Sequence, residues 1–281
     1  MPSPLDPKAT ARLTLCCSLS LHPVSTGAAM HLAGYRALGL PFTYVPFQVG
    51  DIEGAVRGLR ALGIRGAGVS MPFKLLVIPM LDALDPLAAR IGAVNTIVND
   101  AGRLTGHNTD AAGAVAALEE VRPLAGERVM ILGAGGAARA IAHALQARGP
   151  RSVVIANRDL AKAEALAAST GATAIGLEAA VAEASSRGVV INATSMGMAD
   201  VDPRSPLPEE AWAPGQVVMD IVYKPIETEL VRAARRKGAQ VIHGGRMLLH
   251  QAARQFSLYT GVPAPLEAME AALTAQIGGS S

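Results

Sequence analysis

A run of small residues at positions 133–138 has the spacing needed to hold a pyrophosphate. The run reads Gly133-Ala134-Gly135-Gly136-Ala137-Ala138 and follows an apolar stretch that predicts a strand. In such a loop the first glycine permits a tight turn, the second lets the backbone approach phosphate, and the small last residue lets the next helix pack closely. The helix N-terminus also favours negative charge. We therefore expect a dinucleotide site, although a glycine-rich turn without a ligand has the same pattern.

The residues after the next predicted strand, 152–156, bear on the choice between NADP and NAD. Asn157, Arg158 and Asp159 follow that strand, and Lys162 comes one helical turn later. A guanidinium and an ammonium suit a ribose 2′-phosphate, which favours NADP. NAD remains open because Asp159 could accept the 2′-hydroxyl of its ribose. The alternatives are that Asp159 caps a helix and that the two cations belong to a solvated helix start.

The composition limits the class of protein. The chain has 281 residues, half of them hydrophobic, which suffices for two ordinary domains. Lys and Arg number 25 against 23 Asp and Glu, and no basic run could follow a nucleic-acid backbone. No run approaches the ~20 apolar residues of a membrane span. We interpret residues 1–13, with their three prolines, as a loose tail and not as a signal peptide.

The two cysteines indicate the compartment. Cys16 and Cys17 are adjacent within an apolar run, as expected for two buried small hydrophobes in a reducing environment. We therefore expect a cytoplasmic protein without a metal site. The expected partner is a small-molecule substrate and not nucleic acid or a membrane, and the expected assembly is a monomer or a homodimer.

Short apolar runs alternate with helical patterns along the chain, which predicts an α/β protein. In the first half we expect strands at residues 13–19, 42–47 and 66–71, helices at 28–38 and 52–62, and a hairpin of 93–98 with 103–106 around the turn residues 99–102. A helix at 111–121 then leads to strands separated by Ala-rich helical stretches, at 128–132, 152–156, 188–192, 217–221 and 240–242. That rhythm is typical of a doubly wound parallel sheet. The chain should end in two helices, 247–260 and 265–276.

Seven short segments resemble motifs of the shikimate dehydrogenase family and occur in that family's order. They are residues 69–74 (VSMPFK), 93–96 (AVNT), 108–110 (NTD), 133–136 (GAGG), 157–158 (NR), 192–195 (NATS) and 220–225 (DIVYKP). The resemblance extends from about residue 15 to about residue 261. Segments 15–20 and 60–74 resemble the shikimate dehydrogenase-like branch more than the enzyme of aromatic amino acid biosynthesis.

The resemblance implies two domains with the active cleft between them. A substrate-binding catalytic domain with a mixed sheet is expected from residues 1–109 plus 246–281, and a Rossmann NADP-binding domain from residues 110–245. The implied activity is that of an NADP-dependent oxidoreductase of the shikimate pathway, which interconverts shikimate and 3-dehydroshikimate.

The resemblance also assigns a catalytic pair. Oxidising a secondary alcohol requires a hydride to leave carbon and the hydroxyl proton to leave for a base. The family's motifs place that proton transfer on Lys74 and let Asp110 orient the lysine and hydrogen-bond the substrate. From the residues alone neither stands out, because a lysine after Pro-Phe is usually solvated and an aspartate opening a helix usually serves the helix N-terminus.

Two further sets of residues follow from the resemblance. The substrate is expected to contact Ser25, Ser70, Asn95, Tyr223 and Gln251. The nicotinamide end of the cofactor is expected near Thr194, Ser195, Met196, Ile221 and Gly244. Each has a structural alternative: Ser25 could cap a helix, Asn95 could serve a strand edge, Tyr223 could pack, Gln251 could be an exposed helix residue, and the second set could be ordinary loop.

Three departures from the family's pattern leave the substrate open. Gly27 stands where a second carboxylate-binding serine is expected, Gly68 where asparagine is common, and Arg246 where a small residue is usual. A site that lacks hydrogen-bonding partners discriminates poorly, so quinate or an aminated analogue is an alternative substrate. A catalytically weak NADP-binding sensor is a rival hypothesis that the presence of Lys74 and Asp110 disfavours. A folate-linked dehydrogenase is another, and the combination of segments 69–74 and 108–110 disfavours it.

Overall fold

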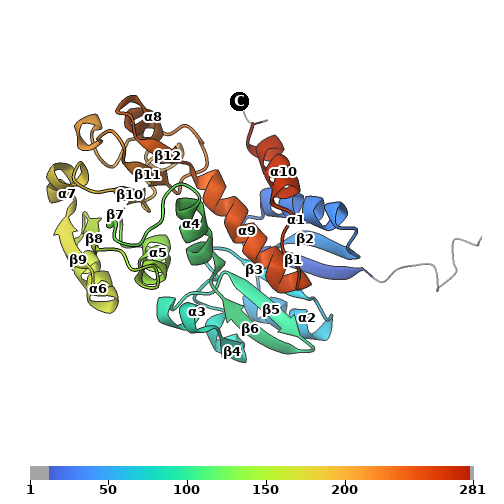
Figure 1. Ribbon diagram of the computed structural model, residues 1–281. Coiled ribbons are helices and arrows are strands. Elements are labelled where there is room, and N and C mark those ends of the chain that lie inside the picture. The colour runs from blue at the N-terminus through green and yellow to red at the C-terminus, as the bar shows by residue number, and fades with distance from the viewer. Residues whose placement is uncertain (1–12, 279–281) are drawn as a thin grey trace, which may run out of the picture. The chain divides into compact units, whose positions relative to one another are not determined.

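The computed structural model describes residues 13–278, which form two compact units (Figure 1). The first unit contains the described residues up to His107 and those from Ala252 onward, and the second contains Asn108–Gln251. The predicted N-terminal tail, apart from Leu13, lies outside the described residues. No helix among residues 13–278 is long and apolar enough to cross a membrane.

The first unit is built on a mixed six-stranded sheet of order β2-β1-β3-β5-β6-β4. Its strands are β1 (Thr14–Ser20), β2 (Phe42–Gln48), β3 (Gly66–Val69), β4 (Ala83–Leu84), β5 (Thr96–Asp100) and β6 (Arg103–His107). β1 pairs in parallel with β2 and β3, whereas β5 is antiparallel to β3 and β6. The predicted hairpin is confirmed, and its two turn residues, Ala101 and Gly102, both have positive φ, of 52° and 95°.

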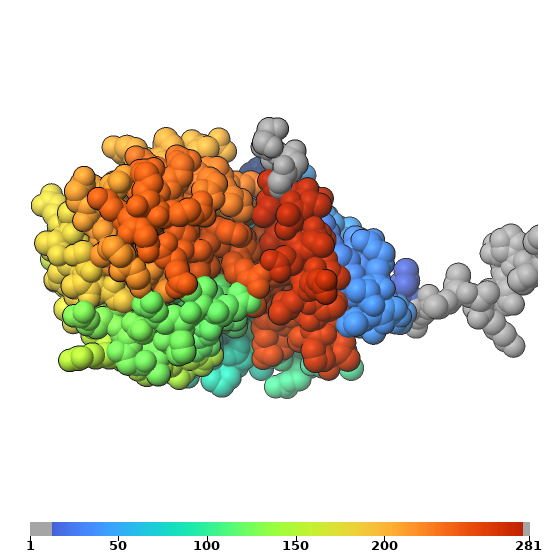
Figure 2. All heavy atoms as spheres, turned by 45° about the horizontal axis from the view of Figure 1, so that its top comes forward, coloured from blue at the N-terminus to red at the C-terminus, as the bar shows by residue number. Residues whose placement is uncertain are grey.

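Helices cover both faces of this sheet. They are α1 (Thr26–Ala37), α2 (Ile52–Ala61), α3 (Pro86–Ile91), the end of α9 (Gly244–Thr260) and α10 (Leu266–Gly278). Because side chains alternate along a strand, Cys17 of β1 packs in a core with Leu59 of α2, whereas the Cys16 thiol interacts with Tyr35 of α1 on the opposite face. α10 packs against α1, and in Figure 2 its red surface lies beside the blue surface of the N-terminal part of the chain.

The second unit has a wholly parallel six-stranded sheet of order β12-β11-β10-β7-β8-β9. Its strands are β7 (Arg128–Leu132), β8 (Ser152–Asn157), β9 (Thr173–Gly176), β10 (Val189–Asn192), β11 (Val217–Asp220) and β12 (Gln240–Ile242). Its helices include α4 (Thr109–Glu119), α5 (Gly136–Gln146), α6 (Leu160–Thr170), α7 (Leu177–Ala184) and α8 (Glu229–Arg236). The strand order reverses at β7 and β10, which is where such sheets bind ligands. The predicted doubly wound sheet is therefore confirmed.

Several short elements are absent from the sequence-based prediction. β4, α3 and β9 have two, six and four residues, too few to show a hydrophobic period. The strand predicted at 66–71 ends at Val69 because the chain turns at Ser70, whose carbonyl accepts from the Phe73 amide. The strand predicted at 93–98 begins only at Thr96.

Candidate active site

The loop between β7 and α5 leaves room for a ligand at a helix N-terminus. Gly133 has φ of +108°, and a Cβ there would lie 3.0 Å from the Ala193 carbonyl oxygen, so only glycine fits without strain. By contrast, a Cβ on Gly135 or Gly136 would meet no atom within 4 Å. Gly135 is the N-cap of α5, and no side chain caps that helix. The residues present therefore fit a pyrophosphate, which α5 would hold by its backbone N–H groups.

A buried polar pair shapes the neighbouring loops at the point where the strand order reverses. Asn192, at the end of β10, donates to the Asp220 carboxylate at 2.9 Å and to the Met196 carbonyl at 3.0 Å. Its Oδ1 accepts from the Thr194 amide and hydroxyl, at 3.1 and 2.7 Å. Burial raises the pKa of Asp220, although the Thr228 hydroxyl and the Val222 amide also donate to it. This pair fixes the loop that carries the predicted residues Thr194, Ser195 and Met196.

The loop after β8 presents the residues predicted to select the cofactor. Asn157 donates from its side chain to the Asp159 carbonyl at 2.8 Å. The Asp159 carboxylate caps α6 by accepting from the Lys162 amide and lies 3.2 Å from the Lys162 ammonium, which lowers the pKa of Asp159. Asp159 therefore caps α6, and its contact with the cofactor ribose stays a prediction. Arg158 is exposed and forms no salt bridge with the described residues.

A close backbone contact holds the loop after β11. A Cβ on Gly244, the first residue of α9, would lie 2.2 Å from the carbonyl oxygen of Ile221 and 2.6 Å from that of Val222. Only glycine therefore lets the start of α9 approach residues 221–222. Two predicted residues, Ile221 and Gly244, are brought together in this way, and Tyr223 follows half-buried on the same loop.

In the first unit, backbone hydrogen bonds bring three predicted residues onto adjoining segments. The Val94 amide donates to the Lys74 carbonyl at 2.9 Å, and the Val69 amide donates to the Asn95 carbonyl at 2.7 Å. Ser70 directly follows Val69, so Ser70, Lys74 and Asn95 lie on neighbouring stretches at the end of β3.

The remaining predicted residues have different surroundings. Ser25 precedes α1 but makes no capping hydrogen bond, and its hydroxyl instead donates to Gln276 of α10 at 3.1 Å. Asp110 belongs to the second unit and lies in the first turn of α4, where Asn108 caps the helix by accepting from the Ala111 amide. Asn108 is therefore the N-cap of α4, and Asp110 is the acidic residue of its first turn.

Gln251 and Arg246 both lie on α9, in the part of that helix that belongs to the second unit. A Cβ on Gly113 of α4 would lie 2.8 Å from the Gln251 backbone nitrogen, so the two helices cross at close range. Arg246 lies on the same helix and makes a two-pronged ion pair with Glu120, at 2.5 and 2.6 Å. Its guanidinium therefore joins α9 to the end of α4.

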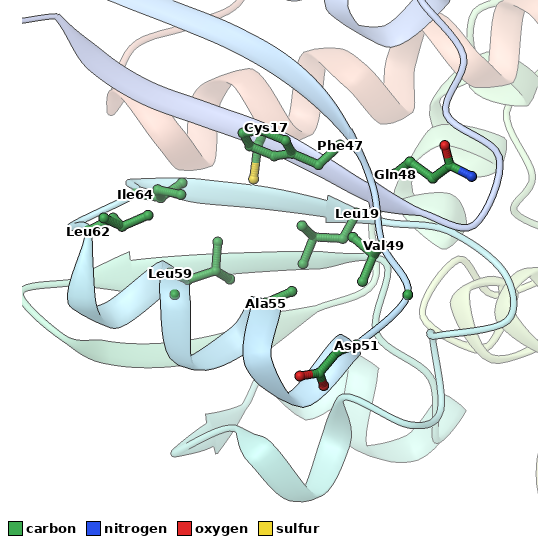
Figure 3. A pocket seen from close by; sticks show the side chains of 12 residues that line it. Cys17, Leu19, Phe47, Gln48, Val49, Asp51, Ala55, Leu59, Leu62 and Ile64 are labelled. Atoms are coloured by element: carbon green, nitrogen blue, oxygen red, sulfur yellow. The ribbon is translucent and has the colours of Figure 1, made fainter.

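A hollow of about 290 Å³ in the first unit is distinct from these residues (Figure 3). It lies between α2 and the strands β1 and β2, and Leu19, Val49 and Leu59 point into it. Its carboxylate, Asp51, caps α2 by accepting from the Gly54 amide at 2.9 Å. The lining is otherwise mainly apolar and contains none of the predicted site residues. Among residues 13–278, no three His, Cys, Asp or Glu side chains are grouped so as to hold a metal ion.

Comparison with protein-family models covers both units. Residues 22–97 match the shikimate dehydrogenase substrate binding domain, and residues 115–205 match shikimate / quinate 5-dehydrogenase. Residues 244–274 match the shikimate 5′-dehydrogenase C-terminal domain.

Individual proteins are similar over almost the whole chain. The shikimate dehydrogenase (NADP(+)) of Moorella thermoacetica is 46% identical over 275 residues, covering 92% of each chain. The structure of shikimate 5-dehydrogenase from Thermus thermophilus in complex with NADP(H) and shikimate is 37% identical, with a TM-score of 0.84, and covers 94% of this chain and 99% of the other. Quinate dehydrogenase from Corynebacterium glutamicum in complex with NAD is 32% identical, with a TM-score of 0.86, and covers 94% and 99%.

Proposed function

Since the chain belongs to the shikimate dehydrogenase family, we propose that it transfers a hydride between NADP and shikimate or 3-dehydroshikimate, or a close analogue of these. The observation that carries the cofactor is the open glycine loop at the uncapped N-terminus of α5, where a pyrophosphate would meet backbone donors. A relative named shikimate dehydrogenase (NADP(+)), which is similar over 92% of this chain, supports shikimate as the substrate. Such a protein is an oxidoreductase acting on a CH–OH group.

The cofactor would be held by three groups of residues. Backbone donors of residues 133–137 bind the pyrophosphate, and Arg158, with Asn157 and Lys162, receives the 2′-phosphate. The loops containing Thr194, Ser195, Met196, Ile221 and Gly244 adjoin the nicotinamide. The bound nicotinamide supplies the hydride acceptor when the alcohol is oxidised.

The chain's own side chains handle the proton and the substrate. Lys74 exchanges the proton of the reacting hydroxyl, and Asp110 hydrogen-bonds the substrate and orients the lysine. Ser25, Ser70, Asn95, Tyr223 and Gln251 donate to or accept from the remaining hydroxyls and the carboxylate. In this proposal residues 1–109 plus 246–281 form the substrate domain and residues 110–245 the NADP domain. The two units of the structure, which divide after His107 and Gln251, support that division.

Quinate is the second candidate substrate. A Cβ on Gly27 would meet no atom within 4 Å, so this position has room that a serine would fill. A similar protein from Corynebacterium glutamicum is a quinate dehydrogenase, bound to NAD. Both observations favour tests with quinate and with NAD beside the main pair.

The test follows the absorbance of the reduced nicotinamide for shikimate, quinate and an aminated analogue, each with NADP and with NAD. We expect the highest kcat/KM for shikimate with NADP. Lys74→Ala should lower kcat by about 10²–10⁴-fold and leave NADP affinity unchanged. Lys237→Ala, at the end of α8, is the matched control and should behave as the wild type. Full turnover in Lys74→Ala would refute the proton-transfer role, and no turnover with any pair would favour the NADP-binding sensor.

We further propose that the protein works in the cytoplasm on small molecules alone, as a monomer or a homodimer. Cys16 and Cys17 are both free and buried, which suits a reducing compartment. Sedimentation of the purified protein at several concentrations would distinguish the two assembly states.

A further inference from the structure

Three buried side chains form a hydrogen-bonded chain that ends at Asn95. His31 of α1, Gln255 of α9 and Thr96 of β5 come from three different elements of the first unit. The His31 Nε2 atom lies 3.4 Å from Gln255 Oε1, and Gln255 Nε2 donates to Thr96 Oγ1 at 2.9 Å. Thr96 Oγ1 in turn donates to Asn95 Oδ1 at 2.8 Å. All four residues are buried.

The direction of this chain is set by a backbone atom. Gln255 Nε2 lies 3.4 Å from the Asn95 carbonyl oxygen, which can only accept. The amide nitrogen of Gln255 therefore faces Asn95 and Thr96, and its oxygen faces His31. The Asn95 atom that lies 2.8 Å from the Thr96 hydroxyl is Oδ1, which can only accept, so the single proton of that hydroxyl points to it. The NH₂ group of Asn95 consequently points away from Thr96.

His31 is the end of this hydrogen-bonded chain that lies farthest from Asn95. Its ring is stacked on Tyr44 at a centroid distance of 4.5 Å and an interplanar angle of 6°. Burial lowers the pKa of His31 to about 4, so the ring is neutral near pH 7. A neutral imidazole facing the Gln255 oxygen carries its proton on Nε2. The stack fixes the plane of the ring, and within that plane Nε2 is the ring nitrogen that faces the Gln255 oxygen.

We propose that His31, Gln255 and Thr96 are positioning residues that hold the Asn95 amide with its carbonyl toward Thr96 and its NH₂ group toward the substrate. This inference rests on the proposed function, in which Asn95 contacts the substrate. Asn95 then donates to an oxygen acceptor of the substrate, such as a hydroxyl, carbonyl or carboxylate oxygen. An ammonium at the same place has no acceptor for this donor, so an aminated analogue bearing its nitrogen there is discriminated against.

The experiment compares Thr96→Val with Thr96→Ser. Valine has the shape of threonine without the hydroxyl, and serine keeps the hydroxyl, so the pair isolates one hydrogen-bonding group. We expect Thr96→Val to raise KM for shikimate about tenfold with KM for NADP unchanged. Thr96→Ser should restore KM to within about twofold of the wild type. In an Asn95→Ala background, Thr96→Val should cause no further rise, because its effect passes through Asn95.

Several outcomes would overturn this inference. A wild-type KM for shikimate in Thr96→Val, whatever happens to thermal stability, would make the network purely structural. Multiplicative effects of Thr96→Val and Asn95→Ala would show that Thr96 does not act through Asn95. A wild-type KM in Asn95→Ala would remove Asn95 from the substrate site but leave the proposed function intact, whereas a wild type without any turnover would remove the proposed function as well.

A measurement that needs no substrate checks the direction of the chain. In ¹⁵N-labelled protein, the imidazole nitrogen shifts of His31 should show a protonated Nε2 and an unprotonated Nδ1 throughout the neutral range. Gln255→Met removes the acceptor while keeping the side-chain length, and it should change the Nε2–H resonance. The opposite tautomer in the wild type would overturn the proposed orientation of Gln255.

Discussion

Replacing Gly135 by valine should separate cofactor binding from folding. Gly135 has φ of −80° and ψ of −170°, an extended conformation that valine adopts readily, and a Cβ there would meet no atom within 4 Å. The expected structural cost is the weaker N-cap preference of valine, about 1 kcal/mol, or roughly 2–4 °C in Tm.

The cost to the cofactor should be larger. Carbon atoms of the new side chain keep other atoms about 3.5–4 Å away, whereas a phosphate oxygen must come within about 3 Å of a backbone nitrogen to accept its hydrogen. Losing one or two hydrogen bonds to a charged acceptor removes about 2–4 kcal/mol, which weakens NADP binding roughly 30- to 1000-fold.

The assay is a fluorescence titration with NADPH, run beside thermal unfolding of the protein without cofactor. Gly133→Ala is the comparison, because Gly133 has φ of +108° and a close carbonyl, so this variant should lose stability as well as affinity. A Gly135→Val protein that binds NADPH as the wild type does would refute the placement of the pyrophosphate at this loop.

Three further predictions follow from the same contacts. Gly244→Ala places a carbon 2.2 Å from a backbone oxygen and should lower Tm by on the order of 10 °C. In the control Gly245→Ala, the new carbon meets side-chain atoms at 3.0 Å, so the loss of Tm should be smaller. Equal shifts of Tm in thermal unfolding would contradict this prediction. The folded-state pKa of His31 is about 4, below its unfolded value of 6.5, so the unfolded chain binds the proton first and stability should fall by about 3 kcal/mol as pH drops from 6.5 to 4. Urea unfolding at several pH values should show that part of the fall missing in His31→Gln. Arg158→Ala should weaken NADP binding at least about tenfold and leave NAD binding unchanged, and a parallel loss for both in calorimetry would rule out contact with the 2′-phosphate.

The alternation of short apolar runs with helical patterns is sufficient to predict most of the strands and helices. The strands at 128–132 and 152–156 are strongly apolar and are followed by turn residues, and both occur as predicted, to within one residue. The hairpin around residues 99–102 is predicted from its turn residues and the two flanking strand patterns, and the positive φ of Ala101 and Gly102 agrees with it. The capping signal of Asp85 followed by Pro86 could have located α3, which the periodicity missed.

The site was predicted less completely, for a physical reason. Gln255 lies in α9, and nothing in its local sequence shows that its amide is buried against Thr96, 159 residues earlier. The bond between Ser25 and Gln276 joins residues 251 positions apart and is equally invisible. Asn192 and Asp220 fall within the motifs that resemble the family, but their mutual hydrogen bond depends on the pairing of β10 with β11. Contacts of this kind depend on the tertiary arrangement of strands and helices, which local sequence patterns do not give.

The two adjacent cysteines, Cys16 and Cys17, lie in the packing on opposite faces of β1, so each can report on one of the two faces. Cys16 and Cys17 project to opposite faces, so they cannot join in a disulfide while the strand persists. Burial raises their pKa values, to about 11 for Cys16 and about 12 for Cys17, which keeps both thiols unreactive in the closed fold. The rate at which each cysteine is alkylated therefore measures how often the packing on its own side of the sheet opens to solvent.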